Sequence, residues 1–231
     1  RNALCISGTH GKTTTTSMIT SMLELAGRDP AAVIGGKLPL IGGYGKAGKG
    51  NCIVIEACEY AETFLKLTPD IAVLLNIDND HLDYYGTMGQ LKFAFKKFAL
   101  MATHTIVANA DDANTMHTLE GETRAVRTFG LEHGDVHAAN LVWDQGLPCF
   151  DVMWREQIFT HVSLRVPGLH NVKNALAAAA AAIALAVEPK AVSEGLAAFR
   201  GAGRRFEHKG TYHGAEVYDD YAHHPGELKA L

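Results

Sequence analysis

The sequence predicts an α/β fold in which a mostly parallel sheet is flanked by helices, with a small antiparallel β section. Three observations lead to this prediction. Short apolar runs of the kind that form buried parallel strands recur along the first half of the chain. Helix-like segments separate these runs, so that strand and helix alternate. A glycine-rich loop joins the first apolar run to the first helix, as in the phosphate loops of P-loop sheets.

The first half of the chain supplies the parallel part of the predicted sheet. Gly27 follows the first predicted helix at a position typical of a C-cap glycine. Residues 42–50 are rich in glycine and predict a surface stretch between strands. The predicted strands are residues 4–7, 32–34, 52–55, 71–75 and 105–108, and the predicted helices are residues 12–25, 61–66, 88–101 and 112–119.

The second half changes character after about residue 124. Residues 136–166 carry β-rich runs at 150–154 and 162–166, and a turn at 145–148 predicts antiparallel pairing. Residues 171–187 and 189–199 return to helix, and 215–218 predicts a new strand. We therefore expect a central domain over residues 1–200, then a linker and the start of a truncated C-terminal domain over 201–231.

The bulk composition narrows the class of protein. The 231 residues are 47% hydrophobic and 20% charged, as in ordinary globular proteins, and no apolar run is long enough to cross a membrane. A net charge of −4 gives no broad attraction to nucleic acid. Cys5, Cys52 and Cys58 lie in or beside apolar runs, and no CxxC pair occurs, which favours reduced core cysteines and a cytoplasmic location. The oligomeric state stays open.

The loop from Gly8 to Thr13 carries the strongest functional signal. Its glycines allow a tight turn whose N–H groups can face an anion, and the following helix terminus favours negative charge. Lys12 would then contact phosphate oxygens and the Thr13 hydroxyl would ligate Mg²⁺. Only two residues separate Gly8 from Gly11, and a solvated turn with a surface lysine is the alternative. The candidate nucleotide-binding residues here are Gly8, Thr9, His10, Gly11, Lys12, Thr13 and Thr14.

Polar residues follow the later apolar strands at the same edge of the predicted sheet. Glu56 and His81 come after residues 52–55 and 71–75, where ligands bind in open parallel sheets. Both side chains can hold a divalent cation, although Glu56 could instead form a structural salt bridge. Glu59 could share the site or lie on the surface. The pair at residues 111–112 could cap a helix or take part in catalysis.

Taken together, these motifs resemble the Mur ligase family in order and spacing. The likeness spans nearly the whole chain. The run Asp219-Asp220-Tyr221-Ala222-His223-His224-Pro225 looks like that of the family member that adds L-alanine. The matching segments are residues 8–13, 56–59, 76–77 with 80–83, 109–112, 168–171 with Asn174, 203–206 and 219–225.

The resemblance implies a three-domain protein of which this sequence matches the complete central domain and the first strand of the last domain. We therefore expect a fragment that lacks the UDP-binding domain and most of the amino-acid-binding domain. Cys58 stands where many relatives carry Asp. Lys96 or Lys97 falls near the carbamylated lysine of several sister ligases, and a solvated helix lysine is the preferred interpretation.

The resemblance also implies roles for individual residues, with ATP and Mg²⁺ as cofactors. Thr13 and Glu56 would hold one Mg²⁺, and Glu56 with His81 would lie near a second. Arg205, more than Arg204, matches the hinge arginine that reaches nucleotide phosphate. The implied catalytic residues are Lys12, Glu56, His81 and Arg205; His170, Asn171 and Asn174 would lie near adenine, with capping and packing as their alternative, and Asp219 or Asp220, with His223, near ribose and adenine.

The implied activity is that of an ATP-dependent amide ligase of peptidoglycan synthesis. It would join L-alanine to UDP-N-acetylmuramate through an acyl phosphate, and the fragment alone would be inactive. One alternative is a sister ligase, such as murein-tripeptide ligase or folylpolyglutamate synthase. An alternative of another class is a P-loop nucleotide-binding switch module without ligation.

Overall fold

The structure is a computed structural model that describes residues 2–205, 207–224 and 228–229. Phe206 and Pro225, which belong to two of the motifs above, lie outside the described residues. The strands are β1 (Asn2–Ser7), β2 (Ala31–Leu38), β3 (Gly43–Lys46), β4 (Cys52–Glu56), β5 (Ile71–Leu74), β6 (Thr105–Asn109), β7 (Val126–Gly130), β8 (Val136–Asp144), β9 (Leu147–Trp154), β10 (Gln157–Ser163), β11 (Glu207–Tyr212) and β12 (Ala215–Asp219). The helices are α1 (Lys12–Leu25), α2 (Leu82–Tyr85), α3 (Met88–Leu100), α4 (Ala113–Thr118), α5 (Leu169–Ala184) and α6 (Pro189–Ala198), with 3-10 segments η1 (Pro39–Ile41) and η2 (Tyr60–Lys66).

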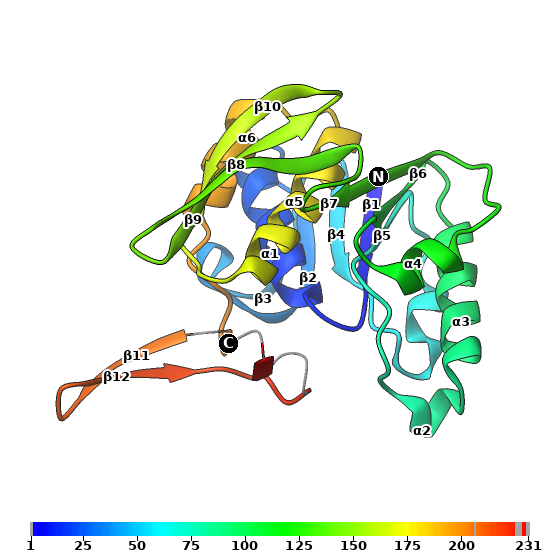
Figure 1. Cartoon of the computed structure of the whole chain (residues 1–231), viewed down its shortest axis with the longest axis horizontal. Helices are drawn as coiled ribbons and strands as arrows, with labels where there is room; N and C mark the ends of the chain where they lie inside the picture. The colour runs from blue at the N-terminus through cyan, green and yellow to red at the C-terminus, as the bar shows by residue number, and fades with distance from the viewer. Residues whose placement is uncertain (1, 206, 225–227, 230–231) are drawn as a thin grey trace.

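One large sheet organises the main body (Figure 1). In the described residues its strand order is β10-β9-β8-β7-β6-β5-β1-β4-β2-β3, and β11 pairs with β12 in a separate hairpin. The seven neighbouring strands β8, β7, β6, β5, β1, β4 and β2 pair in parallel. Strands β3, β9 and β10, at the two ends of the sheet, are antiparallel to their neighbours. The predicted α/β class is therefore confirmed. The antiparallel section is continuous with the parallel sheet through the β7–β8 pair.

Helices cover both faces of this sheet because its central strands are apolar on both sides. In β1, Leu4 and Ile6 belong to one buried cluster, together with residues of α1, α5 and α6, whereas Cys5 belongs to the other, with residues of α3. Successive side chains of a strand point to opposite faces, so one short run contributes to two cores. The alanine-rich run 175–182 is buried within α5, which confirms the helix predicted there.

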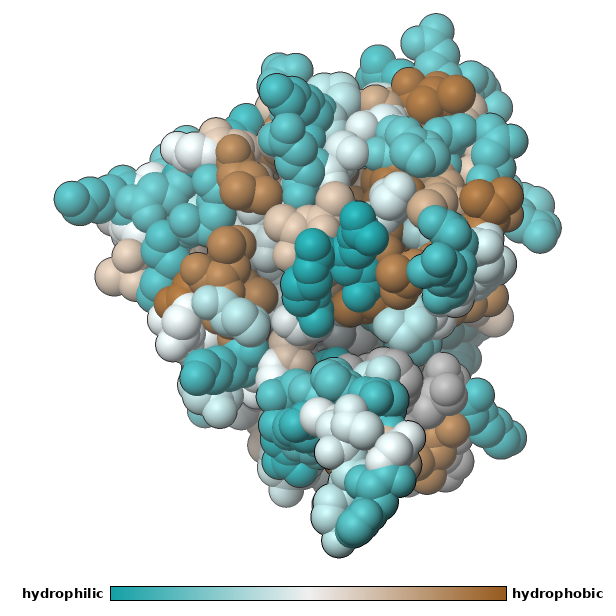
Figure 2. Space-filling view, turned by 90° about the vertical axis from the view of Figure 1, so that its left-hand side faces the viewer, coloured by the Kyte–Doolittle hydropathy of each residue, from teal (hydrophilic) through white to brown (hydrophobic). Residues whose placement is uncertain are grey.

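The predicted turn at residues 145–148 joins β8 to β9. Gln145 and Gly146 form it with φ 49° and 80°, the left-handed pair that a two-residue hairpin with the right strand twist requires. Pro148 is already within β9, opposite Trp143. The β11–β12 hairpin extends away from the main body (Figure 1). On the face shown in Figure 2, hydrophobic patches are small and separated by hydrophilic side chains.

Several local predictions were wrong. Residues 61–66 form the 3-10 segment η2, in which Ala61 and Glu62 have left-handed backbones that no α-helix accepts. The strand predicted at 162–166 ends at Ser163, because its last pairing partner on β9 is Cys149. Cys58 was predicted to be a core cysteine, but it is exposed, because it follows the end of β4. Strand β3, within the predicted surface stretch, and α2, β7 and β11 were not predicted.

Candidate functional site

The predicted phosphate loop joins the end of β1 to the start of α1. Gly11 stands directly before α1 with φ 87°, in the left-handed region that favours glycine. A Cβ atom there would also lie 2.4 Å from Asn174 Oδ1, too close for any side chain. Within the described chain, no side chain caps the first turn of α1. Its N–H groups and its partial positive charge are therefore available to an anion.

Lys12 turns back over this loop. Its Nζ donates hydrogen bonds to the carbonyl oxygens of Gly8 (2.6 Å) and Thr9 (3.2 Å) and to Glu59 Oε1 (3.0 Å). The Glu59 side chain is 1% exposed and that of Lys12 14%. The alternatives of a surface lysine and a surface Glu59 are therefore wrong, because Glu59 is buried, Lys12 is partly buried and the two charges form an ion pair.

Glu56 lies beside Thr13, the second residue of α1. Its Oε1 accepts a hydrogen bond from the Thr13 hydroxyl at 3.1 Å, and its Oε2 accepts one from the Gly35 amide at 2.6 Å. A Cβ atom on Gly35 would lie 2.4 Å from Glu56 Oε1, so only glycine leaves room for the carboxylate. The hydroxyl and the carboxylate thus present hard oxygen ligands side by side, which suits Mg²⁺.

His81 reaches the same area from the loop after β5. Its Nε2 lies 3.8 Å from Glu59 Oε1 and 3.6 Å from Asp80 Oδ2. Glu59 therefore lies between His81 and Lys12, and Lys12 is the chain neighbour of Thr13. His81 is thus linked to Lys12 through the carboxylate of Glu59, whereas Glu56 contacts Thr13.

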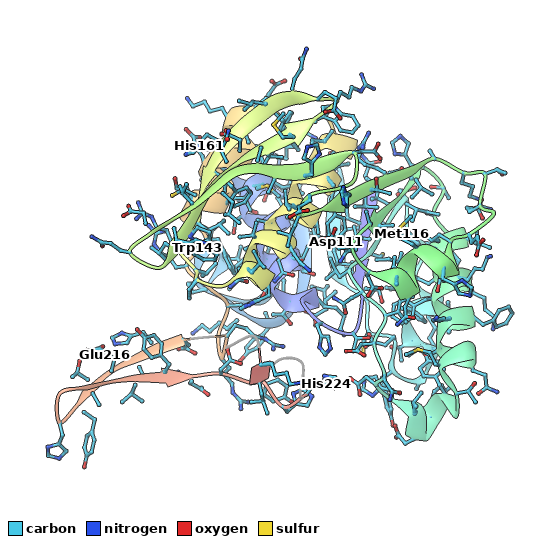
Figure 3. The ribbon with its side chains drawn as sticks, viewed as in Figure 1. Asp111, Met116, Trp143, His161, Glu216 and His224 are labelled. Carbon is cyan, nitrogen blue, oxygen red and sulfur yellow. The ribbon has the colours of Figure 1, made fainter. Side chains whose placement is uncertain are left out.

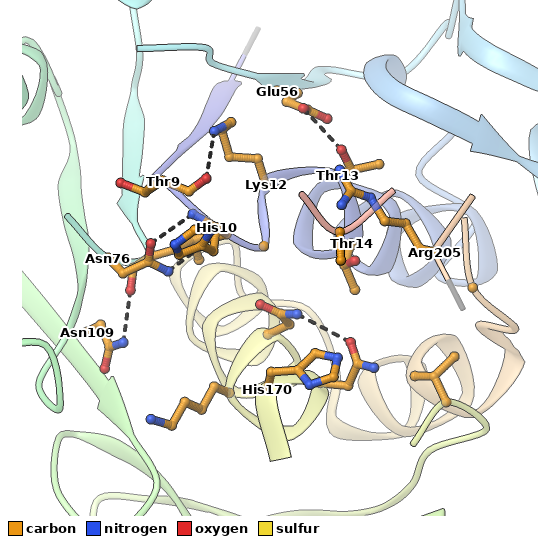
Figure 4. A pocket seen from close by; sticks show the side chains of 18 of the residues that line it. Thr9, His10, Lys12, Thr13, Thr14, Glu56, Asn76, Asn109, His170 and Arg205 are labelled. Atoms are coloured by element: carbon orange, nitrogen blue, oxygen red, sulfur yellow. Dashed lines mark hydrogen bonds between the residues drawn. The ribbon is translucent and has the colours of Figure 1, made fainter. Parts of the chain in front are cut away.

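The opposite wall comes from the start of α5. Asn174 Nδ2 donates to Asn171 Oδ1 at 3.3 Å, and the Thr15 hydroxyl donates to Asn174 Oδ1 at 3.4 Å. Both asparagines are buried. Partial desolvation of the His170 ring lowers its pKa, and the charge of Asp220 opposes this effect. The three residues line the same cavity as the phosphate loop, and Figure 4 shows His170 on its α5 side.

A cavity of about 300 Å³ lies between these walls. Gly8, His81 and Asp219 are candidates that do not line it. His81 instead contacts Glu59, the ion-pair partner of Lys12. The cavity is lined by Thr9, His10, Gly11, Lys12, Thr13, Thr14, Glu56, Leu75, Asn76, Asn109, Phe129, Val166, His170, Asn171, Lys173, Asn174, Phe199, Gly201, Arg205, Asp220 and Ala222.

The structure distinguishes within two pairs that the sequence left open. Arg205 lines the cavity, whereas the Arg204 guanidinium lies 4.8 Å from the ring centre of Tyr221 and 3.8 Å from Asp219 Oδ2. Asp220 lines the cavity, whereas Asp219 faces Arg204 and also lies 3.9 Å from Lys209. Arg205 and Asp220 are therefore the members of each pair in position to contact a ligand.

Asn76 and Asn109 line the cavity but received no individual role from the sequence. Asn76 clamps the loop, because its amide accepts from the His10 N–H at 2.8 Å and donates to the His10 carbonyl at 3.0 Å. Asn109 donates to the Leu75 carbonyl at 2.8 Å. Each follows or ends a central strand at the edge where Glu56 lies, and that shared position was the available signal.

Other candidates have structural roles. Asp112 caps α4, because its Oδ1 accepts from the Thr115 amide at 2.7 Å, and Asp111 accepts from the Leu131 amide at 2.8 Å. Lys97 is half exposed and lies 3.8 Å from Glu62. Among the described helices, none has the length and apolar character to span a bilayer.

Three comparisons place this geometry among known proteins. The sequence profile described as the Mur ligase middle domain matches residues 6–182. A UDP-N-acetylmuramate–L-alanine ligase of Caldanaerobacter subterraneus subsp. tengcongensis is 43% identical over 231 residues, which is 98% of this chain and 50% of that protein. The enzyme of the same name from Caldicellulosiruptor bescii is 44% identical over 234 residues, 100% of this chain and 51% of that protein.

Solved structures agree with these matches. The UDP-N-acetylmuramate–alanine ligase of Thermotoga maritima superposes with a TM-score of 0.87 and 31% identity, covering 100% of this chain and 53% of that one. A murein peptide ligase from Psychrobacter arcticus superposes with a TM-score of 0.78 and 29% identity, covering 99% and 53%. The chain thus spans about half the length of the curated relatives it matches.

Proposed function

This chain belongs to the Mur ligase family, as its match to the middle domain shows, and from that premise we propose that its cavity binds the triphosphate of ATP together with Mg²⁺. The supporting observation is the convergence of a partly buried cation, an uncapped helix terminus and a hydroxyl–carboxylate pair on one cavity. These groups offset the charge of a triphosphate and offer oxygen ligands to a hard cation.

Each wall of the cavity has a part in this proposal. Lys12 would exchange the carbonyl oxygens of Gly8 and Thr9 for phosphate oxygens, while Glu59 keeps its amine at the loop. Asn171 and Asn174 would orient the base, with His170 beside them. Arg205 would add positive charge from the segment beyond α6.

Thr13 and Glu56 are the residues in position to hold a Mg²⁺ ion, with His81 near a second. Their fit rests on the 3.1 Å contact between Thr13 Oγ1 and Glu56 Oε1, an arrangement of hard oxygen atoms. A bound Mg²⁺ would neutralise charge on the phosphates. Gly35 is what admits the Glu56 carboxylate to this position.

We further propose that the full-length protein carrying this chain joins L-alanine to UDP-N-acetylmuramate. The substrate carboxylate would attack the γ-phosphorus of ATP, forming an acyl phosphate and ADP. The L-alanine amine would then attack the carbonyl carbon and expel phosphate. Repulsion between carboxylate and triphosphate is the main obstacle, and the positive charge of Lys12 and Arg205 at the cavity lowers it.

The test is phosphate release by the full-length protein with ATP and Mg²⁺. We expect release only when UDP-N-acetylmuramate and L-alanine are both present. Arg205→Met should reduce it, whereas the matched Arg204→Met should not, because Arg204 faces Asp219 and Tyr221. Release without either substrate would indicate a nucleotide switch rather than a ligase.

The murein peptide ligase from Psychrobacter arcticus supports a second candidate, because it shares the fold at 29% identity. Replacing L-alanine by murein tripeptide in the same assay separates the two. The 231 residues alone should release no phosphate in response to L-alanine, because the chain spans only half of its relatives. The proposal sets the reaction in the cytoplasm, where thiols such as its four unpaired cysteines stay reduced.

A further inference from the structure

A second group of ligand-type side chains lies at the rim of the phosphate loop, apart from Thr13 and Glu56. It consists of His10, Asp78 and His224, and one ligand atom of each lies within 4.8 Å of the others. His10 Nε2 is 3.3 Å from Asp78 Oδ2, and the rings of His10 and His224 are 4.6 Å apart between centroids. Of the three, only His10 lines the proposed nucleotide cavity, and Asp78 and His224 are not among its lining residues.

The first two members are held by backbone contacts on either side. His10 is fixed by the two hydrogen bonds of Asn76 to its N–H and carbonyl, at 2.8 and 3.0 Å. The Asp78 amide donates to the Thr9 hydroxyl at 2.9 Å. The loop and the segment after β5 thus present the imidazole and the carboxylate as one unit, which is what a metal site requires of its ligands.

The third member comes from a distant part of the chain. His224 lies on the segment that follows β12, between the β11–β12 hairpin and the side of the main body that carries α2 and α3 (Figure 3). A ligand that engages all three side chains would therefore connect this segment to the phosphate loop.

We propose that His10, Asp78 and His224 form a binding site for a transition-metal ion, with Zn²⁺ as the natural candidate. Two imidazole nitrogens and one carboxylate oxygen are typical ligands of Zn²⁺ and Co²⁺, whereas Mg²⁺ prefers oxygen alone. Three protein ligands leave a coordination position for water. The site is thus chemically distinct from the pair Thr13–Glu56.

The geometry fits such an ion. Ligands about 2.0–2.1 Å from a tetrahedral Zn²⁺ stand about 3.3 Å apart, which matches the distance from His10 Nε2 to Asp78 Oδ2. The side chains of His10 and Asp78 are 23% and 48% exposed, so an ion can enter from solvent.

The test is a titration of the full 231-residue chain with Co²⁺, followed by its visible absorption and by calorimetry. Excess Mg²⁺ is present throughout and occupies the Thr13–Glu56 position. We expect one Co²⁺ per chain with a tetrahedral spectrum, displaced by Zn²⁺. His10→Ala, Asp78→Asn and His224→Ala should each weaken binding by at least about tenfold, the loss that even a supporting residue of a metal site can cause.

Two variants serve as matched controls. His223→Ala removes the neighbouring imidazole, whose Nδ1 lies 2.9 Å from the Tyr221 carbonyl oxygen, and should leave Co²⁺ affinity unchanged. His117→Ala tests an exposed imidazole that pairs with Glu120, far along the chain from all three proposed ligands, in the same way. Circular dichroism establishes that each variant is folded. Absence of Co²⁺ binding, or equal losses in the site variants and the controls, overturns the proposal.

Discussion

Lys12 and Glu59 form an ion pair beneath the phosphate loop, with Nζ 3.0 Å from Glu59 Oε1 and the carboxylate almost completely buried. The two residues are 47 positions apart in the chain. Since Lys12 also bonds two loop carbonyls, the pair fixes the cation at the position where a phosphate would bind. The cation is thus held at the loop, and an arriving phosphate would need to replace only its two carbonyl partners.

Lys12→Met should destabilise the fold more than a surface lysine substitution does. The change leaves the Glu59 carboxylate buried without its cation, at a cost of about 3 kcal/mol. Adding Glu59→Gln removes the stranded charge and should restore at least about 1 kcal/mol. Urea unfolding measures both effects. Lys190→Met, at an exposed pair with Glu194, is the control, and a double variant no more stable than Lys12→Met would contradict the prediction.

Gly35→Ala should disrupt the hydrogen bond between Thr13 and Glu56, although the substitution changes neither of these residues. The new methyl would lie 2.4 Å from Glu56 Oε1, so the carboxylate must move away from Thr13. We expect Mg²⁺-dependent ATP affinity to fall by about tenfold or more, the usual effect of displacing a metal ligand's support. Calorimetry with and without Mg²⁺ measures it. Gly43→Ala, on β3 with no atom closer than 3.6 Å, should bind as the parent does.

Asp220→Asn should lower the pKa of His170 further. Desolvation already lowers this pKa, and the negative charge of Asp220 partly opposes the shift by favouring the imidazolium. Without the Asp220 charge, only the desolvation acts on the pKa of His170, and the pKa falls further. An NMR titration of the His170 ring measures the change. Asp219→Asn should leave the pKa of His170 unchanged, because Asp219 faces Arg204 and Lys209. Equal shifts of this pKa in both variants would contradict the prediction, because they would mean that Asp220 is no closer to His170 than Asp219 is.

Asp70→Asn should reduce the amount by which the free energy of unfolding falls as the pH is lowered. The Thr103 hydroxyl and the Ala3 amide donate to Asp70 at 2.6 and 2.8 Å and lower its pKa. The folded pKa therefore lies below the unfolded value of about 3.9. The resulting stabilisation is complete above that value and is lost as the pH falls through the folded pKa. Urea unfolding between neutral pH and about pH 3 measures it.

Thr103→Val supplies the control for the acid experiment. It removes the main cause of the Asp70 shift and should reduce the same pH dependence. In the Asp70→Asn background it should change nothing further, because the group that it acts on no longer titrates. An acid profile that Thr103→Val alters equally in both backgrounds would show that Asp70 is not the responsible group.

Much of the sheet could be predicted from local patterns. Residues 52–55 and 105–108 are apolar on both faces, and such runs form central parallel strands wherever helices cover both sides. Strand β7 escaped prediction because Arg127 and Thr128 interrupt its apolar pattern and its first three residues are only partly buried. The segment at 61–66 has helical composition, but its position after β4 bends it into 3-10 turns through Ala61 and Glu62. Local preference yields to tertiary context there.

The sequence predicted where the site residues lie along the sheet edge better than it predicted which side chains they contact. Glu56 and His81 were expected from their places after strands, and both lie at that edge. The burial of Glu59 and the need for glycine at position 35 were not visible, because each depends on an atom from a distant part of the chain. The same holds for Asp220 over Asp219, which neighbour each other in sequence yet face different partners.

The sequence by itself determined the alternation of strand and helix, the phosphate loop at Gly11, and the polar residues after each strand. Such features arise from steric and periodic preferences that act over a few residues. Only the tertiary structure decided which side chains meet. The parallel register that sets Ile6 opposite Glu56 brings Thr13 to Glu56 and Lys12 to Glu59, because pairing between distant strands fixes distances that no local pattern specifies.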